Sequence, residues 1–220
     1  RVDPDLYQHI DPVAVGNDMR MLVSDMAGRA SIELKGRELG IDLTGRKDVL
    51  ARVVERVKDA EANGYTYDAA DASFALLLRE EIEGHRPTYF RLESWRASVS
   101  YGERFGSDGE SEATVKLHAG DQRFVCTGEG NGPVNALDHA LRAALVQVYP
   151  EIETFALIDF KVRLLDTSSG TDATTRVLIQ TSDGESVWST VGVGPNILEA
   201  SWEALAESLT YGLLQAGVSP

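Results

Sequence analysis

The second part of the chain repeats one order of elements, and this internal repeat constrains the fold more than any other feature. Residues 88–150 carry an extended segment, a loop, two short strand patterns joined by a turn, a Gly-Pro sequence and an amphipathic helix pattern. Residues 151–220 carry the same elements in the same order. A β-β-β-α unit exposes one apolar sheet face, so two such units are expected to cover each other. The predicted fold class is therefore α+β, with a duplicated β-β-β-α domain at 88–220.

Alternation of apolar and polar residues places the strands of the repeat. In 89–101, for example, Trp95, Ala97 and Val99 alternate with polar residues, as a strand with one buried face requires. The first unit is predicted to contain strands at 89–101, 113–118 and 123–127, and a helix at about 134–148. The second is predicted to contain strands at 155–165, 174–181 and 187–191, and a helix at about 196–214.

Residues 1–87 are predicted to form a separate, helical linker region. Helix patterns occupy 24–39, 47–63 and 68–83, and in the second of these the apolar residues recur on one face. The sequence Gly84-His-Arg-Pro87 marks the boundary with the repeat. These helices are short, and we expect them to have no sizeable core of their own.

Charge and cysteine content exclude several classes of protein. The 220 residues include 35 acids and 21 bases, a net charge of −14, which repels nucleic acids and anionic membranes. No apolar run approaches the roughly 20 residues that span a bilayer. Cys126 is the only cysteine, so neither an intrachain disulfide nor a cysteine-based metal site is possible. Because the sequence starts at Arg1 without a Met, we expect a piece of a longer cytoplasmic protein.

Two Gly-Pro sequences lead into the helices of the repeat. They are GEGNGPVNALDHAL at 128–141 and GVGPNILEASWEAL at 192–205. Glycine lets a ligand approach the backbone, and free amides at a helix start attract carboxylates and phosphates. Three interpretations remain open: a turn that binds nothing, a dinucleotide site, or a site for a small anionic metabolite. The dinucleotide site is the weakest, because the pattern is not G-x-G-x-x-G and no βαβ crossover surrounds it.

Longer stretches resemble a known family. GNGPVNAL, LIDFKVRLLDTSSGTDATTRVLI and GVGPNILEASWEAL resemble the C-terminal regulatory domain of the 2-isopropylmalate synthase and citramalate synthase family. YQHIDPVAVGN and SDMAGRASI resemble the segment that links this domain to the catalytic barrel in that family. The HIDP…VGN…AGR sequence and the GVGPN ending favour the citramalate synthase branch.

The resemblance implies an enzyme whose catalytic part is not visible in this sequence. The family condenses acetyl-CoA with a 2-oxo acid in a TIM barrel that holds a divalent metal. His9 is implied to relay a proton in a partner subunit's active site, with Asp11 and Asn17 as supporting residues and Arg29 holding the linker to the barrel. The chain's four histidines are scattered, so we expect no metal site here and no synthase activity from this chain alone.

The resemblance also implies a homodimer that binds a branched-chain amino acid as feedback inhibitor. Isoleucine follows from the citramalate synthase branch, and leucine is the alternative. Leu157 and Phe160 differ in strand parity, so one face presents both only where the strand is twisted or bulged. The implied effector residues are Asn131, Gly132, Pro133, Val134, Leu157, Phe160, Leu164, Asp172, Ala173, Thr175, Gly194 and Pro195.

Two other classes of function remain open from the sequence. The first is a scaffold domain in which both Gly-Pro turns are purely architectural. The second is a free-standing enzyme that uses His9 or His139 as a base. The enzyme ranks last, because the sequence has no clustered nucleophile, metal ligands or paired acids.

Overall fold

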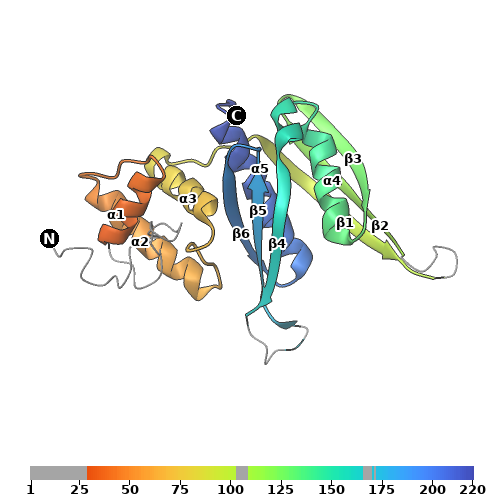
Figure 1. Cartoon of the computed structure of the whole chain (residues 1–220), viewed down its shortest axis with the longest axis horizontal. Helices are drawn as coiled ribbons and strands as arrows, with labels where there is room; N and C mark the ends of the chain where they lie inside the picture. The colour runs from red at the N-terminus through yellow and green to blue at the C-terminus, as the bar shows by residue number, and fades with distance from the viewer. Residues whose placement is uncertain (1–28, 103–108, 166–169, 171) are drawn as a thin grey trace, which may run out of the picture.

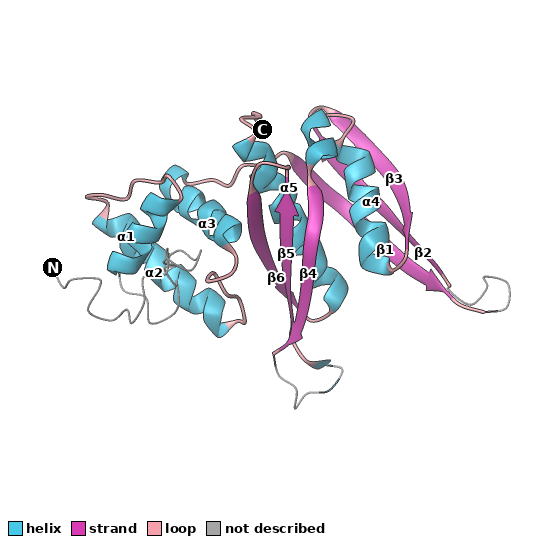
Figure 2. Ribbon diagram, viewed as in Figure 1, coloured by secondary structure: helices cyan, strands magenta, loops and turns pink. Residues whose placement is uncertain are grey.

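The structure, a computed structural model, contains three helices followed by two units of three strands and one helix (Figures 1 and 2). It describes residues 29–102, 109–165, 170 and 172–220. The helical part comprises α1 (Arg29–Glu38), α2 (Lys47–Ala62) and α3 (Asp71–Glu83). The first unit comprises β1 (Phe90–Ser100), β2 (Glu110–Ala119), β3 (Gln122–Gly130) and α4 (Pro133–Leu145). The second comprises β4 (Ala156–Leu164), β5 (Thr175–Ser182), β6 (Val187–Gly194) and α5 (Ile197–Gln215).

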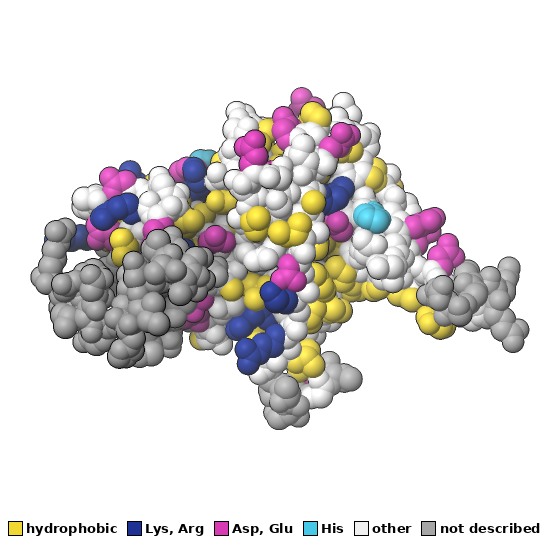
Figure 3. Space-filling view, in the orientation of Figure 1, with side chains coloured by type: hydrophobic (Ala, Val, Ile, Leu, Met, Phe, Trp, Pro, Cys, Tyr) yellow, Lys and Arg dark blue, Asp and Glu magenta, His cyan; other side chains and the backbone are white. Residues whose placement is uncertain are grey.

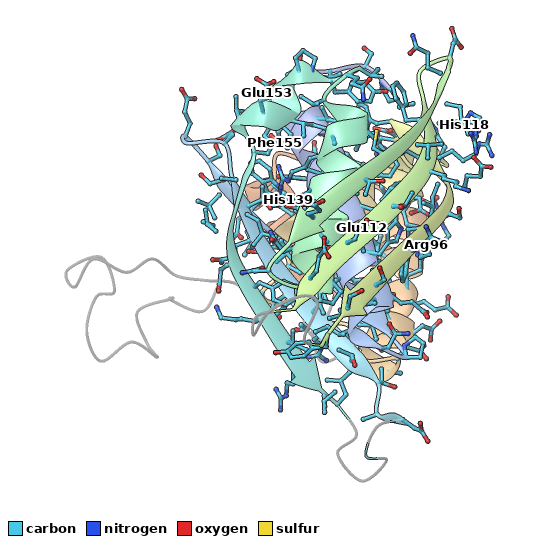
Figure 4. The ribbon with its side chains drawn as sticks, turned by 90° about the vertical axis from the view of Figure 1, so that its right-hand side faces the viewer. Arg96, Glu112, His118, His139, Glu153 and Phe155 are labelled. Carbon is cyan, nitrogen blue, oxygen red and sulfur yellow. The ribbon has the colours of Figure 1, made fainter. Side chains whose placement is uncertain are left out.

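The two units confirm the predicted α+β fold with a duplicated β-β-β-α domain. Each unit has a three-stranded antiparallel sheet, in the order β1-β2-β3 or β4-β5-β6. Seen from the side of the first sheet, α4 and α5 lie behind its strands and in front of the second sheet (Figure 4). One core cluster joins Val115 of β2, Leu141 of α4, Ile179 of β5 and Leu209 of α5, each 0% exposed. The two helices therefore fill the space between the sheets.

The outer face of the first sheet is polar. Arg96, Glu112 and His118 lie on the first sheet and do not point into the layer of helices behind it (Figure 4). Along β2 the burial alternates, so that Ala113, Val115 and Leu117 on the inner face are buried. This alternation is what the sequence predicts for a sheet with one face in water.

The two units match residue by residue in their first strands. β1 has a bulge between Leu92 and Ser94, and β4 has one between Leu157 and Asp159. Trp95 lies opposite the inner residue Val115. In the same way, Phe160 lies opposite the inner residue Ile179. Trp95 and Phe160 therefore occupy equivalent positions of the repeat.

The helices also pack on their sheets in the same way. A Cβ added at Gly128 would lie 2.5 Å from the carbonyl oxygen of Ala136, and one at Gly192 would lie 2.0 Å from that of Ala200. Only glycine allows a strand and a helix to approach so closely. Ala136 of α4 and Ala200 of α5 are thus equivalent.

The two Gly-Pro sequences, in contrast, do not coincide. Pro133 is the first residue of α4, after the N-cap Gly132. In the second unit the N-cap is Asn196, so Pro195 comes before the helix and Ile197 is its first residue. Relative to the helix start, proline therefore lies two positions earlier in the second unit, so the shared Gly-Pro pattern does not mark equivalent residues.

The helical part has a core, contrary to our expectation. Ile32, Val53, Phe74 and Leu78 are each 0% exposed and form one cluster, which also includes Val191 of β6. α3 packs against β6 and α5, and the helical part lies on the side of the second sheet away from the first (Figure 1). The apolar stripes of the three helices therefore cover one another and the edge of the second sheet.

Side chains close the free edge of β6. Alternate amides along an edge strand point away from the sheet and require acceptors. Ser73 of α3 and Glu203 of α5 supply two of these acceptors, and Asp71 supplies the third. The hydrogen bonds run from Ser189 N to Asp71 Oδ1 (3.2 Å), from Val191 N to Ser73 Oγ (2.9 Å) and from Val193 N to Glu203 Oε2 (2.9 Å).

The lengths of two strands and the link between the two units differ from the prediction. β2 and β3 are longer than predicted, and a 3-10 turn at Pro150–Thr154 was not predicted at all. This turn carries the chain from α4 to β4. Within the described residues, none of the helices is both long and apolar enough to cross a membrane.

Candidate functional site

A pocket of about 930 Å³ lies between α4, the 3-10 turn and β4. Figure 4 labels three residues of its wall: His139 on α4, Glu153 in the 3-10 turn, and Phe155, which follows that turn. The pocket is lined by Asn131, Gly132, Pro133, Val134, Asn135, Asp138, His139, Arg142, Ala143, Val146, Ile152, Glu153, Phe155, Ala156, Leu157, Phe160 and Ile197.

Half of the predicted effector residues line this pocket. They are Asn131, Gly132, Pro133, Val134, Leu157 and Phe160. The others lie outside its lining: Leu164 is 49% exposed near the end of β4, Asp172 is exposed, Ala173 and Thr175 are buried, and Gly194 and Pro195 precede α5. From the start of the second unit's helix, α5, it is Ile197 that lines the pocket. The predicted His9, Asp11 and Asn17 lie outside the described residues.

The start of α4 is open toward the pocket. The N-cap Gly132 has no side chain, and no side chain caps the first turn of α4. At α5, in contrast, Asn196 Oδ1 accepts hydrogen bonds from Leu198 N and Glu199 N, each at 3.0 Å. The first amides of a helix need acceptors and carry partial positive charge. A carboxylate in the pocket would satisfy the amides at the start of α4.

A buried ion pair fixes one wall of the pocket. Arg142 Nε donates to both carboxylate oxygens of Asp138, at 2.8 and 2.9 Å, and Nη1 donates to the carbonyl oxygen of Phe155 at 2.5 Å. Asp138 is 7% exposed. Because Phe155 directly precedes β4, this bond ties α4 to β4 and sets the distance between the two walls.

His139 is held by hydrogen bonds on both ring nitrogens. Asn135 Nδ2 can only donate, so His139 Nε2 accepts from it at 3.3 Å. Nδ1 then carries the proton and donates to the carbonyl oxygen of Glu129 at 2.7 Å. Both nitrogens are thus engaged in positioning α4 on β3, which is not the arrangement of a general base.

The opposite wall is apolar. Ile152 and Phe155 are 2% and 5% exposed, and Leu157 and Phe160 are half-buried. The bulge between Leu157 and Asp159 turns Leu157 and Phe160 to the same face of β4. This bulge resolves the parity mismatch of the sequence. The pocket therefore combines an open helix start with a hydrophobic wall.

Sequence reasoning missed Asp138, Arg142 and the 3-10 turn, and it named His139 only as a possible base of a free-standing enzyme, not as part of an effector site. Asp138 and Arg142 are spaced by four residues, as are Asn135 and His139, so each pair shares a face of α4. That spacing indicates local pairs on a helix. It does not show that another segment lies opposite them.

A smaller, polar cavity of about 200 Å³ lies between the helical part and α5. Glu207 accepts hydrogen bonds there from Ser73 Oγ and from Arg86 Nη2, the latter at 2.5 Å. Burial raises the pKa of the Glu207 carboxyl, although Arg86 and Ser73 oppose this effect. Tyr65 Oη donates to Glu203 Oε1 at 2.7 Å. These contacts join the helical part to the middle of α5.

No metal site is formed by the part of the chain that the structure describes. Within residues 29–102, 109–165, 170 and 172–220, His, Cys, Asp and Glu side chains do not gather in groups of three or more that could hold an ion.

Comparison with known proteins identifies the family. The sequence model of the LeuA allosteric (dimerisation) domain matches residues 68–213, from just before α3 to the last turn of α5. The chain belongs to this family. The match confirms the regulatory-domain resemblance that the sequence motifs gave.

The relatives within and around this family are longer proteins. An (R)-citramalate synthase of Streptomyces coelicolor is 62% identical over the whole chain, and one of Aquifex aeolicus is 41% identical over 95% of it. A 2-isopropylmalate synthase of Aquifex aeolicus is 28% identical over 95% of the chain. The chain spans 41%, 39% and 37% of these three proteins, respectively.

Proposed function

We propose that the chain is the effector-sensing and dimerising portion of a citramalate synthase-like enzyme. In this proposal, the pocket beside α4 binds a branched-chain amino acid that inhibits the condensation of acetyl-CoA with a 2-oxo acid elsewhere in the protein. The family's description as an allosteric and dimerisation domain supports the regulatory role. The names of the relatives at 62% and 41% identity support the citramalate synthase branch.

The observation that carries this proposal is the uncapped start of α4 facing an apolar wall in one pocket. An aliphatic amino acid has a carboxylate for the helix start and a branched side chain for Leu157, Phe160 and Ile197. Its ammonium group requires an acidic partner. Asp138 and Glu153 line the pocket, whereas the predicted Asp172 does not, so we assign the ammonium to one of these two carboxylates.

Isoleucine is the favoured effector and leucine the alternative. The two isomers differ in the position of one methyl group, a difference worth about 1–3 kcal/mol in a well-fitted apolar pocket. The preference for isoleucine rests on the greater similarity to the citramalate synthases, 62% and 41%, than to the 2-isopropylmalate synthase, 28%.

Exposed apolar side chains on β1 and β4 form a surface on which the expected homodimer could pack. α4 packs mainly on β2 and β3, and α5 on β5 and β6, so the inner faces of β1 and β4 are less covered. On these faces Val99, Val162 and Leu164 are 54%, 42% and 49% exposed. Hydrophobic side chains are visible on the surface between β4 and the first sheet (Figure 3). Burying each such side chain against a second copy would contribute about 1.5–3 kcal/mol.

Calorimetric titration with isoleucine, leucine and valine tests the effector site. We expect saturable heat with isoleucine for the wild-type chain, and an affinity lowered by about tenfold (roughly 1.4 kcal/mol) for Phe160→Ala. Val125→Ala is the matched control, because Val125 is 51% exposed on β3, outside the pocket lining. No heat with any of the three amino acids at millimolar concentration would establish the scaffold alternative.

The catalytic assignments concern the longer protein. His9, with Asp11 and Asn17, is proposed to act in a partner subunit's active site, where a divalent metal would be held by the catalytic barrel. The chain of 220 residues is therefore expected to release no CoA from acetyl-CoA and pyruvate. Release of CoA by the purified chain would refute this division of roles.

A further inference from the structure

The duplication gives the effector pocket a counterpart on the other side of the molecule. The pocket lies between α4 of the first unit and β4 of the second. The equivalent groove lies between α5 of the second unit and β1 of the first. Equivalence of individual residues follows from the matching bulges, from the strand register and from the two close glycine contacts described above.

Tryptophan fills the apolar half of the second groove. Trp95 on β1 is equivalent to Phe160 on β4. Trp202 follows Ala200 as Asp138 follows Ala136, so Trp202 takes the place of Asp138. The rings of Trp95 and Trp202 are stacked, with centroids 6.5 Å apart and planes inclined by 28°. Where the first groove leaves space beside Phe160, the second thus contains an indole ring of the chain itself.

The polar half of the second groove is closed as well. The carboxylate seat in the first groove depends on Gly132, which leaves the first amides of α4 without a side-chain acceptor. The equivalent N-cap of α5 is Asn196, whose Oδ1 accepts from Leu198 N and Glu199 N. A ligand carboxylate at this helix start would have to displace the cap. Two independent substitutions within the repeat therefore block the two halves of one site.

We propose that the groove between α5 and β1 is a second copy of the effector pocket that Trp202 and Asn196 keep closed. The chain then binds one branched-chain amino acid per copy, although its fold provides two equivalent grooves. This inference rests on the proposed function of the first pocket. Beyond that function, Trp202 and Asn196 set the number of effector molecules bound per chain, and the second groove, once opened, takes a branched-chain amino acid.

The test is the stoichiometry of isoleucine binding in calorimetry. The wild-type chain is expected to bind one isoleucine per copy. The double variant Asn196→Gly with Trp202→Ala is expected to bind two. The second should bind with lower affinity, because Trp95 remains in the groove and is larger than Phe160, its equivalent in the first groove. Asn196→Gly alone is expected to stay at one, since the Trp202 ring still fills the groove; glycine is well tolerated as an N-cap.

Each outcome decides something distinct. Two isoleucines bound by the wild-type chain, or one bound by a folded double variant, would overturn the closed second site while leaving the first pocket intact. Absence of any binding by the wild-type chain would instead refute the proposed function. If Trp202→Ala prevents folding, Asn196→Gly with Trp95→Ala opens the same groove from the strand side, and it is expected to bind two.

Discussion

The ion pair between Arg142 and Asp138 is the element of the pocket whose removal has the most predictable effect. Arg142 makes three hydrogen bonds, two to Asp138 and one to the carbonyl oxygen of Phe155. The two side chains are 19% and 10% exposed. Arg142→Ala would leave the Asp138 carboxylate in a nearly buried position without its partner.

The magnitude follows from this burial. Breaking a buried ion pair by removing one partner typically costs about 3–5 kcal/mol. Because Arg142 is partly exposed and water can replace part of its contact, we expect about 2–3 kcal/mol here. For a chain of this size, each kcal/mol corresponds to roughly 2–4 °C in Tm, so the expected decrease is about 4–12 °C.

Thermal unfolding followed by circular dichroism measures this effect, and Arg123→Ala is the control. Arg123 also makes two hydrogen bonds to one carboxylate, that of Glu93, at 2.7 and 3.2 Å. These two side chains are 47% and 42% exposed, so solvent screens the pair and its removal should barely change Tm. Adding Asp138→Asn to Arg142→Ala should recover part of the lost Tm, because no unpaired charge is then buried.

The affinity for isoleucine, the proposed effector, provides a second measurement on the same variants. Arg142 ties α4 to the residue before β4, so its loss should loosen the pocket and raise the Kd for isoleucine, by about tenfold. Arg123→Ala should leave the Kd unchanged. The reasoning is refuted if Arg142→Ala and Arg123→Ala lower Tm by the same amount, or if Asp138→Asn lowers the Tm of Arg142→Ala further.

Three other perturbations give expected outcomes. Gly192→Ala places a Cβ 2.0 Å from the carbonyl oxygen of Ala200, so α5 must shift, and denaturant unfolding should show that the free energy of unfolding falls by about 1–3 kcal/mol. Gly132→Ala is the control, because a Cβ at that position has open space around it and should cause no such loss. Ser73→Ala removes the acceptor of a buried β6 amide and a donor to Glu207, and the same assay should show a loss of about 1–3 kcal/mol. Burial raises the pKa of the Glu207 carboxyl. Its contribution to the free energy of unfolding is therefore greatest below the ordinary pKa of Glu and is lost as the pH rises through the raised pKa. Between about pH 4 and about pH 8, the Tm of Glu207→Gln should fall less steeply than the Tm of the wild-type chain.

The spacing of apolar residues along the sequence, with a period of two in strands and of about 3.6 in helices, allowed the fold to be predicted. In β5, residues 175, 177, 179 and 181 are buried and their neighbours are half-exposed, so the pattern of period two locates both the strand and its inner face. In α2, Val49, Leu50, Val53 and Val57 are the buried residues, and they share one face of the helix. Each of these patterns reports the burial of a single element, which a sequence records directly.

The pocket could be predicted only in part, because it depends on which elements meet. Asp138, His139 and Arg142 occupy a polar face of α4 that the sequence presents as an ordinary solvent face. They line a pocket because the 3-10 turn and β4 lie opposite them, and this contact is made between segments from different units. The parity mismatch of Leu157 and Phe160 in the sequence indicated a twist or bulge in this strand, but it did not show where in the strand the bulge lies.

α5 contacts both the pocket and the helical part of the chain. Its first residue, Ile197, lines the pocket, and its middle residues Glu203 and Glu207 bond Tyr65, Ser73 and Arg86 in the polar cavity. A packed helix moves as a rigid body more easily than it bends, so a shift that a ligand causes at Ile197 would reach the middle of α5 with little loss. Coupling between two sites requires that the ligand bind two arrangements with different affinity, typically by about 1–3 kcal/mol. Ile197 is 40% exposed, so a ligand in the pocket would bury apolar area at the start of α5, and the free energy of that burial could bias the position of the helix.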